Sequence, residues 1–104
     1  MKKHGMRPVP PGEILNEEFL KPLRMTANAL AKSIGVPTNR ITAILKGERG
    51  ITGDTAIRLG TFFKTSAEFW MNLQMTYELR NAEKALPARV RKRIEDNRGA
   101  QVKL

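Results

Sequence analysis

The sequence predicts an all-α protein of five helices followed by a basic C-terminal tail. Between Pro10 and Ala82, apolar residues recur at the three- and four-residue spacing of a helix face, and no segment shows the sustained alternation of a strand. Proline, glycine and N-capping residues interrupt these segments at short intervals. A chain of 104 residues can bury one modest core. These three observations favour a single helical domain.

The first two helices are predicted from their end signals. A helix begins after the proline pair at positions 10–11, where GEILNEEFL carries an apolar stripe and Glu13 suits the positive end of the helix dipole. Pro22 is expected to end it. The second helix follows Thr26 as N-cap and ends at Gly35, which is free to adopt a positive φ.

Three further helices are predicted in the same way. The third runs from about Pro37 to Lys46 and is ended by Gly47. The fourth follows Thr52 as N-cap. The stretch TSAE, residues 65–68, has the form of a capping box and opens a longer fifth helix through about Ala82.

The net charge of the chain indicates which kinds of partner it can bind. Lys and Arg total 19 against 10 acidic residues, a formal net charge of +9, which favours nucleic acid, an acidic membrane or an acidic protein. Cysteine is absent, which excludes disulfides and thiolate metal sites and fits a reducing cytosol. No apolar run is long enough to span a membrane, and the basic start MKKHGMRPVPPG lacks the apolar segment of a secretory signal. A cytoplasmic location is therefore expected.

Other function classes find little support. Glu13 and Glu17 can share a helix face, but nothing supplies a nucleophile or a set of metal ligands, and His4 stands alone. We expect no enzyme, no cofactor and no metal. The aromatic residues lie mostly at core spacing, which argues against a stacking platform for single-stranded nucleic acid. The tail is too short to indicate a membrane-surface helix.

The second and third predicted helices have helix-turn-helix spacing. Two short helices joined by about three residues around Gly35 set the second helix across the first. Ala31 is the small residue expected where the helices cross, and Ile41 and Ile44 are expected to hold the second helix onto the first. The spacing of these residues, more than any one of them, predicts the motif.

The outward face of the third helix has the composition of a DNA-reading surface. An amide can pair with adenine, Arg with guanine, and Ala can lie against a thymine methyl group. No acid lies on this face, although a polar face that lacks acid by chance is the alternative. Lys32, Lys46 and Arg49 are candidates for phosphate contacts. On a helical wheel the outward residues are Asn39, Thr42, Ala43 and Lys46, with Arg40 on one flank and Thr38 on the other. Asn39 and Arg40 are the leading candidates for base reading.

The fifth helix carries more apolar surface than one docking face requires. One face includes Trp70, Leu73 and Tyr77, and a second includes Met71, Met75 and Leu79. Two apolar faces indicate either a second contact, with a dimer partner or another protein, or a helix buried on both sides. The candidate dimer or partner interface is Trp70, Met71, Met75, Tyr77 and Leu79.

From about Pro11 to Ala82 the chain resembles the λ-repressor-like (XRE) helix-turn-helix family and, within it, the HigA-type antitoxins. The likeness lies in PPGEILNEEFLKPL, ALAKSIGVPTNRITAILKGERGIT, DTAIRLGTFF and SAEFWMNLQMTYEL, with Trp–x–x–Leu–Gln–x–x–Tyr at 70–77 the most specific pattern. The resemblance implies a five-helix homodimer that represses its own operon and neutralises a RelE-like mRNA-cleaving toxin. The family's DNA-reading positions match Thr38, Asn39, Arg40, Thr42, Ala43 and Lys46. A regulator without a toxin partner is the alternative.

The predicted organisation has three parts. Residues 1–9 form a flexible basic segment, residues 10–84 form the helix-turn-helix DNA-binding domain with a dimerising fifth helix, and residues 85–104 form a basic tail able to become partly helical. The tail is either solvated or available to phosphates or a toxin. Two departures from the family stand out: Ala27 replaces a frequent Gln, and Glu78 replaces a frequent Asp.

Overall fold

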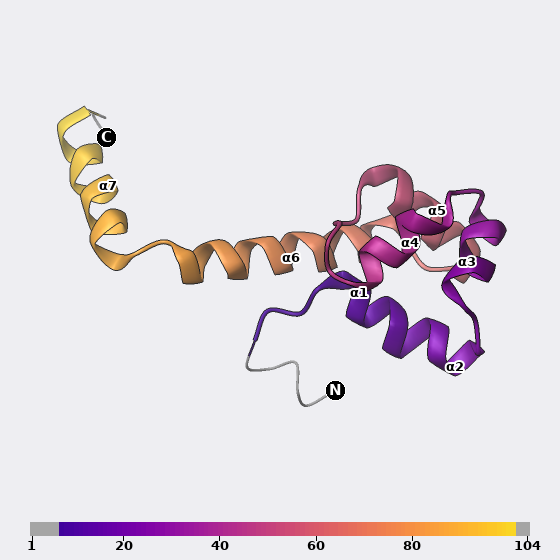
Figure 1. Ribbon diagram of the computed structural model, residues 1–104. Coiled ribbons are helices and arrows are strands. Elements are labelled where there is room, and N and C mark those ends of the chain that lie inside the picture. The colour runs from indigo at the N-terminus through magenta and orange to yellow at the C-terminus, as the bar shows by residue number, and fades with distance from the viewer. Residues whose placement is uncertain (1–6, 102–104) are drawn as a thin grey trace.

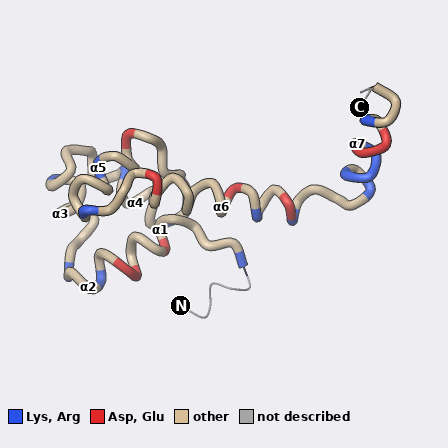
Figure 2. Tube along the Cα trace, turned by 180° about the vertical axis from the view of Figure 1, so that it is seen from behind, with Lys and Arg blue, Asp and Glu red and all other residues tan. Residues whose placement is uncertain are grey.

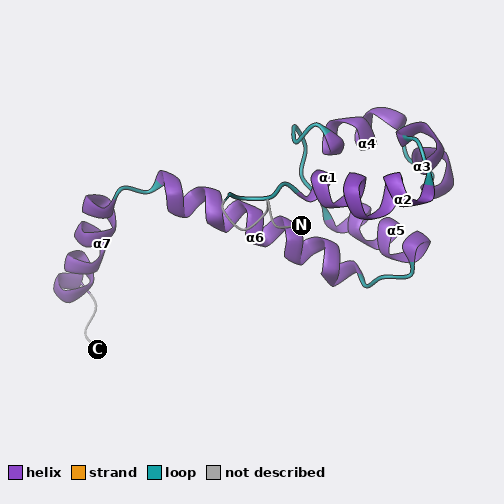
Figure 3. Ribbon diagram, turned by 90° about the horizontal axis from the view of Figure 1, so that it is seen from below, coloured by secondary structure: helices purple, strands orange, loops and turns teal. Residues whose placement is uncertain are grey.

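The chain folds as a series of helices. The computed structural model describes residues 7–101, and within this range it contains no strand (Figure 1, Figure 3). The all-α prediction is confirmed, but the number of helices is wrong: α1, η2 and α2 run on without a break, so the described residues form six helical segments instead of five. The elements are α1 (Pro11–Ile14), η2 (Leu15–Leu20), α2 (Lys21–Leu23), α3 (Ala27–Ile34), α4 (Thr38–Leu45), α5 (Gly53–Phe63), α6 (Ala67–Ala85) and α7 (Ala88–Gln101).

The additional segment is α7, which occupies most of the predicted tail. Its fourteen residues carry basic and acidic side chains along their length, and all are exposed except the partly buried Val90 (Figure 2). The second half of α6 and all of α7 extend away from the helical body (Figure 1). The flexible segment predicted at 1–9 falls largely outside the described residues. The division of the chain into 10–84 and a tail remains a prediction.

Pro22 does not end the first helix, contrary to expectation. It lies within α2, and the helix continues to Leu23 before Arg24 adopts the left-handed conformation at φ 55°. The preceding η2 is a π-helix, in which the Lys21 N–H donates to the Asn16 carbonyl five residues back. A π turn is wider than an α turn, which relieves the clash between a proline ring and the carbonyl four residues earlier.

The core lies where η2, α3, α4, α5 and α6 meet. Leu15 and Leu20 of the first predicted stripe are buried there, together with Ala31, Ile41 and Ile44, while Phe19 of that stripe is only partly buried against them. Burial of this apolar surface is the main stabilising contribution, about 25 cal/mol per Å² removed from water. The buried apolar residues are Leu15, Leu20, Leu30, Ala31, Ile34, Ile41, Ile44, Ile51, Ala56, Leu59 and Trp70.

An aromatic cluster joins α6 to the core. The ring of Trp70 lies 4.9 Å from that of Phe19 and 5.0 Å from that of Phe69, and Phe19 lies 4.8 Å from Phe63. The tilted and edge-on arrangements of these rings are those that aromatic pairs favour. The cluster therefore connects the first helix, α5 and α6 through contacts that are distant in the sequence.

The beginning of α6 differs from a capping box. Ser66 is the N-cap, and its hydroxyl accepts the Phe69 N–H at 3.0 Å. Thr65, expected to serve in the cap, instead accepts a 2.8 Å hydrogen bond from the indole N–H of Trp70. The polar atom of the buried indole is thus satisfied, as burial of a donor requires.

One glycine permits the closest approach between helices. Gly12 in α1 is buried against the backbone of α4, and a Cβ added to it would lie 1.9 Å from the Ile44 carbonyl oxygen. No side chain fits at that distance, so α1 and α4 can cross here only because residue 12 is glycine. The first helix thereby supports the back of α4.

Candidate nucleic-acid interface

The helix-turn-helix is built by the local signals that predicted it. The Thr26 hydroxyl caps α3 by accepting the Ala29 N–H at 3.0 Å. Gly35 adopts φ 74°, and the Val36 N–H donates to the Ala31 carbonyl at 3.0 Å, which closes the C-terminus of α3. Helix α4 begins three residues after Gly35 and packs against α3.

Helix α4 ends in a Schellman motif. Gly47 adopts φ 77°, its N–H donates to the Ile44 carbonyl at 3.0 Å, and the Glu48 N–H donates to the Ala43 carbonyl at 2.9 Å. Glu48 is therefore turned out of the helix. Because Ile41 and Ile44 are completely or almost completely buried, the opposite face of α4 is fixed toward the outside.

Most of the predicted reading residues lie on this outer face. Asn39 and Lys46 are exposed, while Thr42 and Ala43 are partly exposed. Thr38 is also partly exposed, and its hydroxyl donates to the Asn28 side-chain oxygen of α3 at 2.8 Å. The outer face of α4 is thus a short polar surface without an acidic residue.

The predicted phosphate-contact residues are exposed on the helix-turn-helix and on the loop that follows it. Lys32 is exposed on α3, and Arg49 is exposed in the loop that follows α4. With Lys46 at the end of α4, they place positive charge on both helices of the motif and on the loop. Cations arranged around a short helix in this way suit a polyanion.

Arg40 behaves differently from the other predicted readers. Its Nη1 lies 2.7 Å from Asp54 Oδ2 of α5, and only 23% of its side chain is exposed. Asp54 also accepts from the Nε of Arg58 at 3.0 Å. The pKa of the Asp54 carboxyl lies below its ordinary value, because Arg40, foremost, and Arg58 donate hydrogen bonds to it. No pattern in the sequence marks this pairing, because its two residues are fourteen positions apart.

Gln74, which the sequence indicated only as part of the motif at 70–77, is a structural residue. Its side chain is almost completely buried, and its Oε1 accepts the Ile51 N–H at 2.8 Å while its Nε2 donates to Glu78 at 2.7 Å. Gly50 passes so close that an added Cβ would lie 2.8 Å from the Gln74 amide. Helix α6 thereby holds the loop that follows α4.

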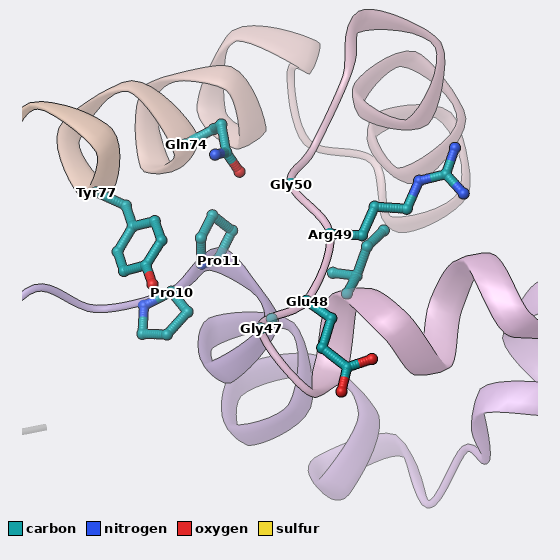
Figure 4. A pocket seen from close by; sticks show the side chains of 10 residues that line it. Pro10, Pro11, Gly47, Glu48, Arg49, Gly50, Gln74 and Tyr77 are labelled. Atoms are coloured by element: carbon teal, nitrogen blue, oxygen red, sulfur yellow. The ribbon is translucent and has the colours of Figure 1, made fainter. Parts of the chain in front are cut away.

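A small cavity lies behind this loop, between the loop, the start of α1 and α6 (Figure 4). Its volume is about 100 Å³, well below the several hundred Å³ of a typical cofactor site. Its labelled lining residues are Pro10, Pro11, Gly47, Glu48, Arg49, Gly50, Gln74 and Tyr77. The start of α1, the loop after α4 and α6 therefore meet at this cavity.

The five predicted interface residues of α6 separate into two groups. Trp70 is completely buried in the core of the single chain, so its assignment to an interface is corrected, and Tyr77 is half-buried at the cavity of Figure 4. Met71, Met75 and Leu79 are 38%, 53% and 56% exposed and line a shallow groove with Ala82. We call Met71, Met75 and Leu79 the α6 stripe. Within the chain α6 is therefore covered on one side only.

The family model HTH_3, described as helix-turn-helix, matches residues 17–70, the range that contains α3, α4 and α5. The chain belongs to this XRE-like helix-turn-helix family. Virulence-associated protein I of Dichelobacter nodosus is 48% identical over 78% of this chain and 75% of its own length. Antitoxin HigA-1 of Vibrio cholerae is 38% identical over 76% of this chain and 74% of its own length. The Pseudomonas aeruginosa antitoxin HigA, solved with the higBA promoter, is 48% identical with a TM-score of 0.75 over 76% of this chain and 86% of that one.

These relatives include HigA antitoxins, as the motif at 70–77 indicated. The structure gives that motif a physical meaning: Trp70 fills the core, Leu73 packs against it, Gln74 holds the loop and Tyr77 lines the cavity. The substitution at Glu78 keeps a carboxylate that accepts from Gln74. The motif thus joins α6 to the core and to the loop that follows α4.

Two further features of the described residues concern membrane spans and metal sites. Among residues 7–101 no helix is long and apolar enough to cross a membrane. The same part of the chain holds no group of three or more His, Asp or Glu residues placed to bind a metal ion. His4 lies outside the described residues.

Proposed function

We propose that this chain is a dimeric, sequence-specific DNA-binding antitoxin that represses its own operon and neutralises a RelE-like mRNA-cleaving toxin in the cytoplasm. The observation that carries the proposal is the outer face of α4, which is exposed, polar and free of acid. The Pseudomonas aeruginosa relative, an antitoxin solved with promoter DNA, supports it. No enzymatic activity is part of this proposal.

In the proposed complex α4 enters the major groove. Asn39 is the leading base reader, because its amide can donate to and accept from one adenine edge, and Ala43 is suited to a thymine methyl group. Thr42 and Lys46 lie on the same face. Lys32 and Arg49 are assigned to phosphates, which fix the register of the protein on the duplex.

Two substitutions on this face should separate base reading from phosphate contact. Asn39→Ala should weaken operator binding by about 1–3 kcal/mol and relax preference at one base position, since a bidentate base contact is lost. Lys46→Ala should weaken binding to all sequences and reduce the slope of log affinity against log salt concentration by about one. The measurement is fluorescence anisotropy on DNA from upstream of the gene, repeated with single base-pair substitutions and at several salt concentrations.

Lys84→Ala is the matched control for Lys46→Ala, because Lys84 is exposed near the distant end of α6. It should leave the salt slope almost unchanged. Wild-type affinity for both Asn39→Ala and Lys46→Ala would remove the outer face of α4 from DNA recognition. Failure of the wild-type chain to prefer its own upstream DNA over unrelated DNA would contradict the proposed function itself.

We assign the interface of the homodimer to the α6 stripe. One short recognition helix reads few bases, so we expect a palindrome whose half-sites lie about 34 Å apart, one turn of the duplex. Exposed methionine and leucine side chains in a row are the composition of a helix that packs against a partner. A second copy of the chain would bring two α4 helices to one operator.

Met75→Asp should convert the dimer to a monomer, because a buried interface cannot accommodate an unpaired carboxylate. Analytical ultracentrifugation measures the mass, and circular dichroism checks that the variant remains folded. Thr76→Asp, which adds the same charge to an exposed position outside the α6 stripe, is the control and should stay dimeric. A dimeric Met75→Asp variant would place the interface elsewhere.

The toxin partner is tested separately. A protein encoded beside this gene, co-expressed with the chain, should form a stable complex with it and lose its mRNA-cleaving activity in that complex. The alternative function, an XRE-type regulator with no toxin partner, predicts operator binding without any such complex. The two outcomes leave the DNA-binding part of the proposal unchanged and decide only whether the chain is an antitoxin.

A further inference from the structure

We propose that Arg40 does not read a base but is a positioning residue, which together with Asp54 fixes the recognition helix against α5 and the helix-turn-helix turn. The inference rests on the proposed DNA binding and changes the part that one of its residues plays. It follows from the juxtaposition of Arg40, Asp54 and Arg58 across three segments of the fold.

The geometry of Arg40 is that of a held side chain. Its Nη1 donates to Asp54 Oδ2 at 2.7 Å, and its Nε is buried and makes no hydrogen bond to the described residues. Asn39 and Lys46, by contrast, are exposed. A bidentate contact from Arg40 to guanine would require the guanidinium to leave Asp54 and rotate out of its present site. Asn39 and Lys46 are already exposed and need no such rearrangement.

Asp54 extends the contact beyond a single pair. Its carboxylate also accepts from Arg58 Nε, at 3.0 and 3.2 Å to its two oxygens. Arg58 Nη1 in turn donates to the Ile34 carbonyl at 2.7 Å and to the Gly35 carbonyl at 3.4 Å, both at the turn between α3 and α4. One carboxylate thus connects the recognition helix, α5 and the turn. Loss of Asp54 releases Arg40 and leaves Arg58 held only by the contacts of its Nη1 with the turn.

Asp54 can affect DNA affinity in two opposite ways. Asp54 is 55% exposed and contacts a residue of the recognition helix, so its negative charge lies on the side of the molecule proposed to approach phosphates. Considered only as a charge, Asp54 opposes DNA binding, and its neutralisation should tighten binding. Considered as the anchor of Arg40 and Arg58, it supports binding, and its neutralisation should weaken it. The two roles therefore predict opposite results for Asp54→Asn.

The test compares Asp54→Asn, Arg40→Ala and the double variant, using the full chain, its upstream operator and an unrelated duplex of equal length. We expect Asp54→Asn to weaken operator binding roughly tenfold, the scale of one charged hydrogen bond, without weakening binding to the unrelated duplex. Arg40→Ala should weaken binding to every single-base variant of the operator by the same factor. The double variant should lose little more than either single variant, because the two residues act as a unit.

Two controls separate positioning from a general loss of stability or charge. Asp96→Asn removes one negative charge from an exposed i, i+4 pair on α7 and should change operator affinity by less than about twofold. Asp54→Glu keeps the carboxylate and should recover part of the operator affinity that Asp54→Asn loses. All measurements are made below the onset of thermal unfolding of every variant.

The possible outcomes are distinct. Tighter or unchanged operator binding by Asp54→Asn overturns the inference while leaving the proposed function intact. Relaxed preference at one base position in Arg40→Ala also overturns it and assigns Arg40 to base reading. A wild-type chain that shows no operator preference contradicts the proposed function, and the inference falls with it.

Discussion

Trp70→Ala should lower the free energy of unfolding by about 3–5 kcal/mol, the range measured for removal of large buried aromatic side chains. Trp70 is completely buried, and its ring contacts those of Phe19 and Phe69. The substitution would leave a cavity in the core, and it would remove the hydrogen bond that the indole N–H donates to the Thr65 hydroxyl. Chemical denaturation followed by circular dichroism measures the loss, and the α6 stripe should then dissociate from its partner more readily.

Phe69→Ala and Trp70→Phe are the control variants for Trp70→Ala. Phe69 belongs to the same cluster but is 37% exposed, so its removal should cost clearly less than removal of Trp70. Trp70→Phe keeps an aromatic ring in place and should retain most of the stability. A loss below about 1 kcal/mol for Trp70→Ala would contradict the complete burial of this residue.

Gly12→Ala should be the second most damaging single substitution, although it adds only one methyl group. Glycine to alanine in a helix ordinarily increases stability by up to about 1 kcal/mol. At position 12 the sign should reverse, because the new Cβ would overlap the Ile44 carbonyl oxygen, which belongs to a backbone that cannot rotate away. We expect a loss of about 2–3 kcal/mol on denaturation, at the upper end of the range for overpacking.

Operator affinity should fall as well in Gly12→Ala, since α4 must move to admit the methyl group. Gly53→Ala provides the matched control: it adds the same methyl group at the start of α5, where no atom lies within 4 Å of the new Cβ. A Gly12→Ala variant as stable as wild type, with unchanged operator affinity, would mean that α1 and α4 do not cross at this point.

The motif itself could be predicted because its signals are local. Ala31, Gly35, Ile41 and Ile44 lie within fourteen residues, and each acts through spacing along one helix or through the conformation of one turn. The C-terminal stop at Gly47 was predictable for the same reason. The exposed face of α4 follows directly, since the buried positions of a helix determine which residues remain outside.

The side-chain contacts that hold the helix-turn-helix and its following loop in place could not be predicted, because they connect residues far apart in the chain. Arg40 and Asp54 are fourteen residues apart on different helices, and Ile51 and Gln74 are twenty-three apart. No periodicity marks such pairs. Pro22 does not end the first helix as predicted, because the rule for proline assumes α-helical turns and the turn before it is a π turn. The extent of α7 was missed because a polar segment lacks a clear apolar face.

Gln74 and Met75 are consecutive residues of α6, one hydrogen-bonded to the loop that follows α4 and the other exposed in the stripe that we propose meets a second copy of the chain. One helix therefore carries both contacts, and a tilt that improves one alters the other. Thermodynamic linkage makes such an effect reciprocal: if occupation of the stripe raises the affinity for DNA by some factor, DNA raises the affinity of the stripe for its occupant by the same factor. Cooperativity between assembly and operator occupancy would then come from α6 itself, with no separate allosteric domain.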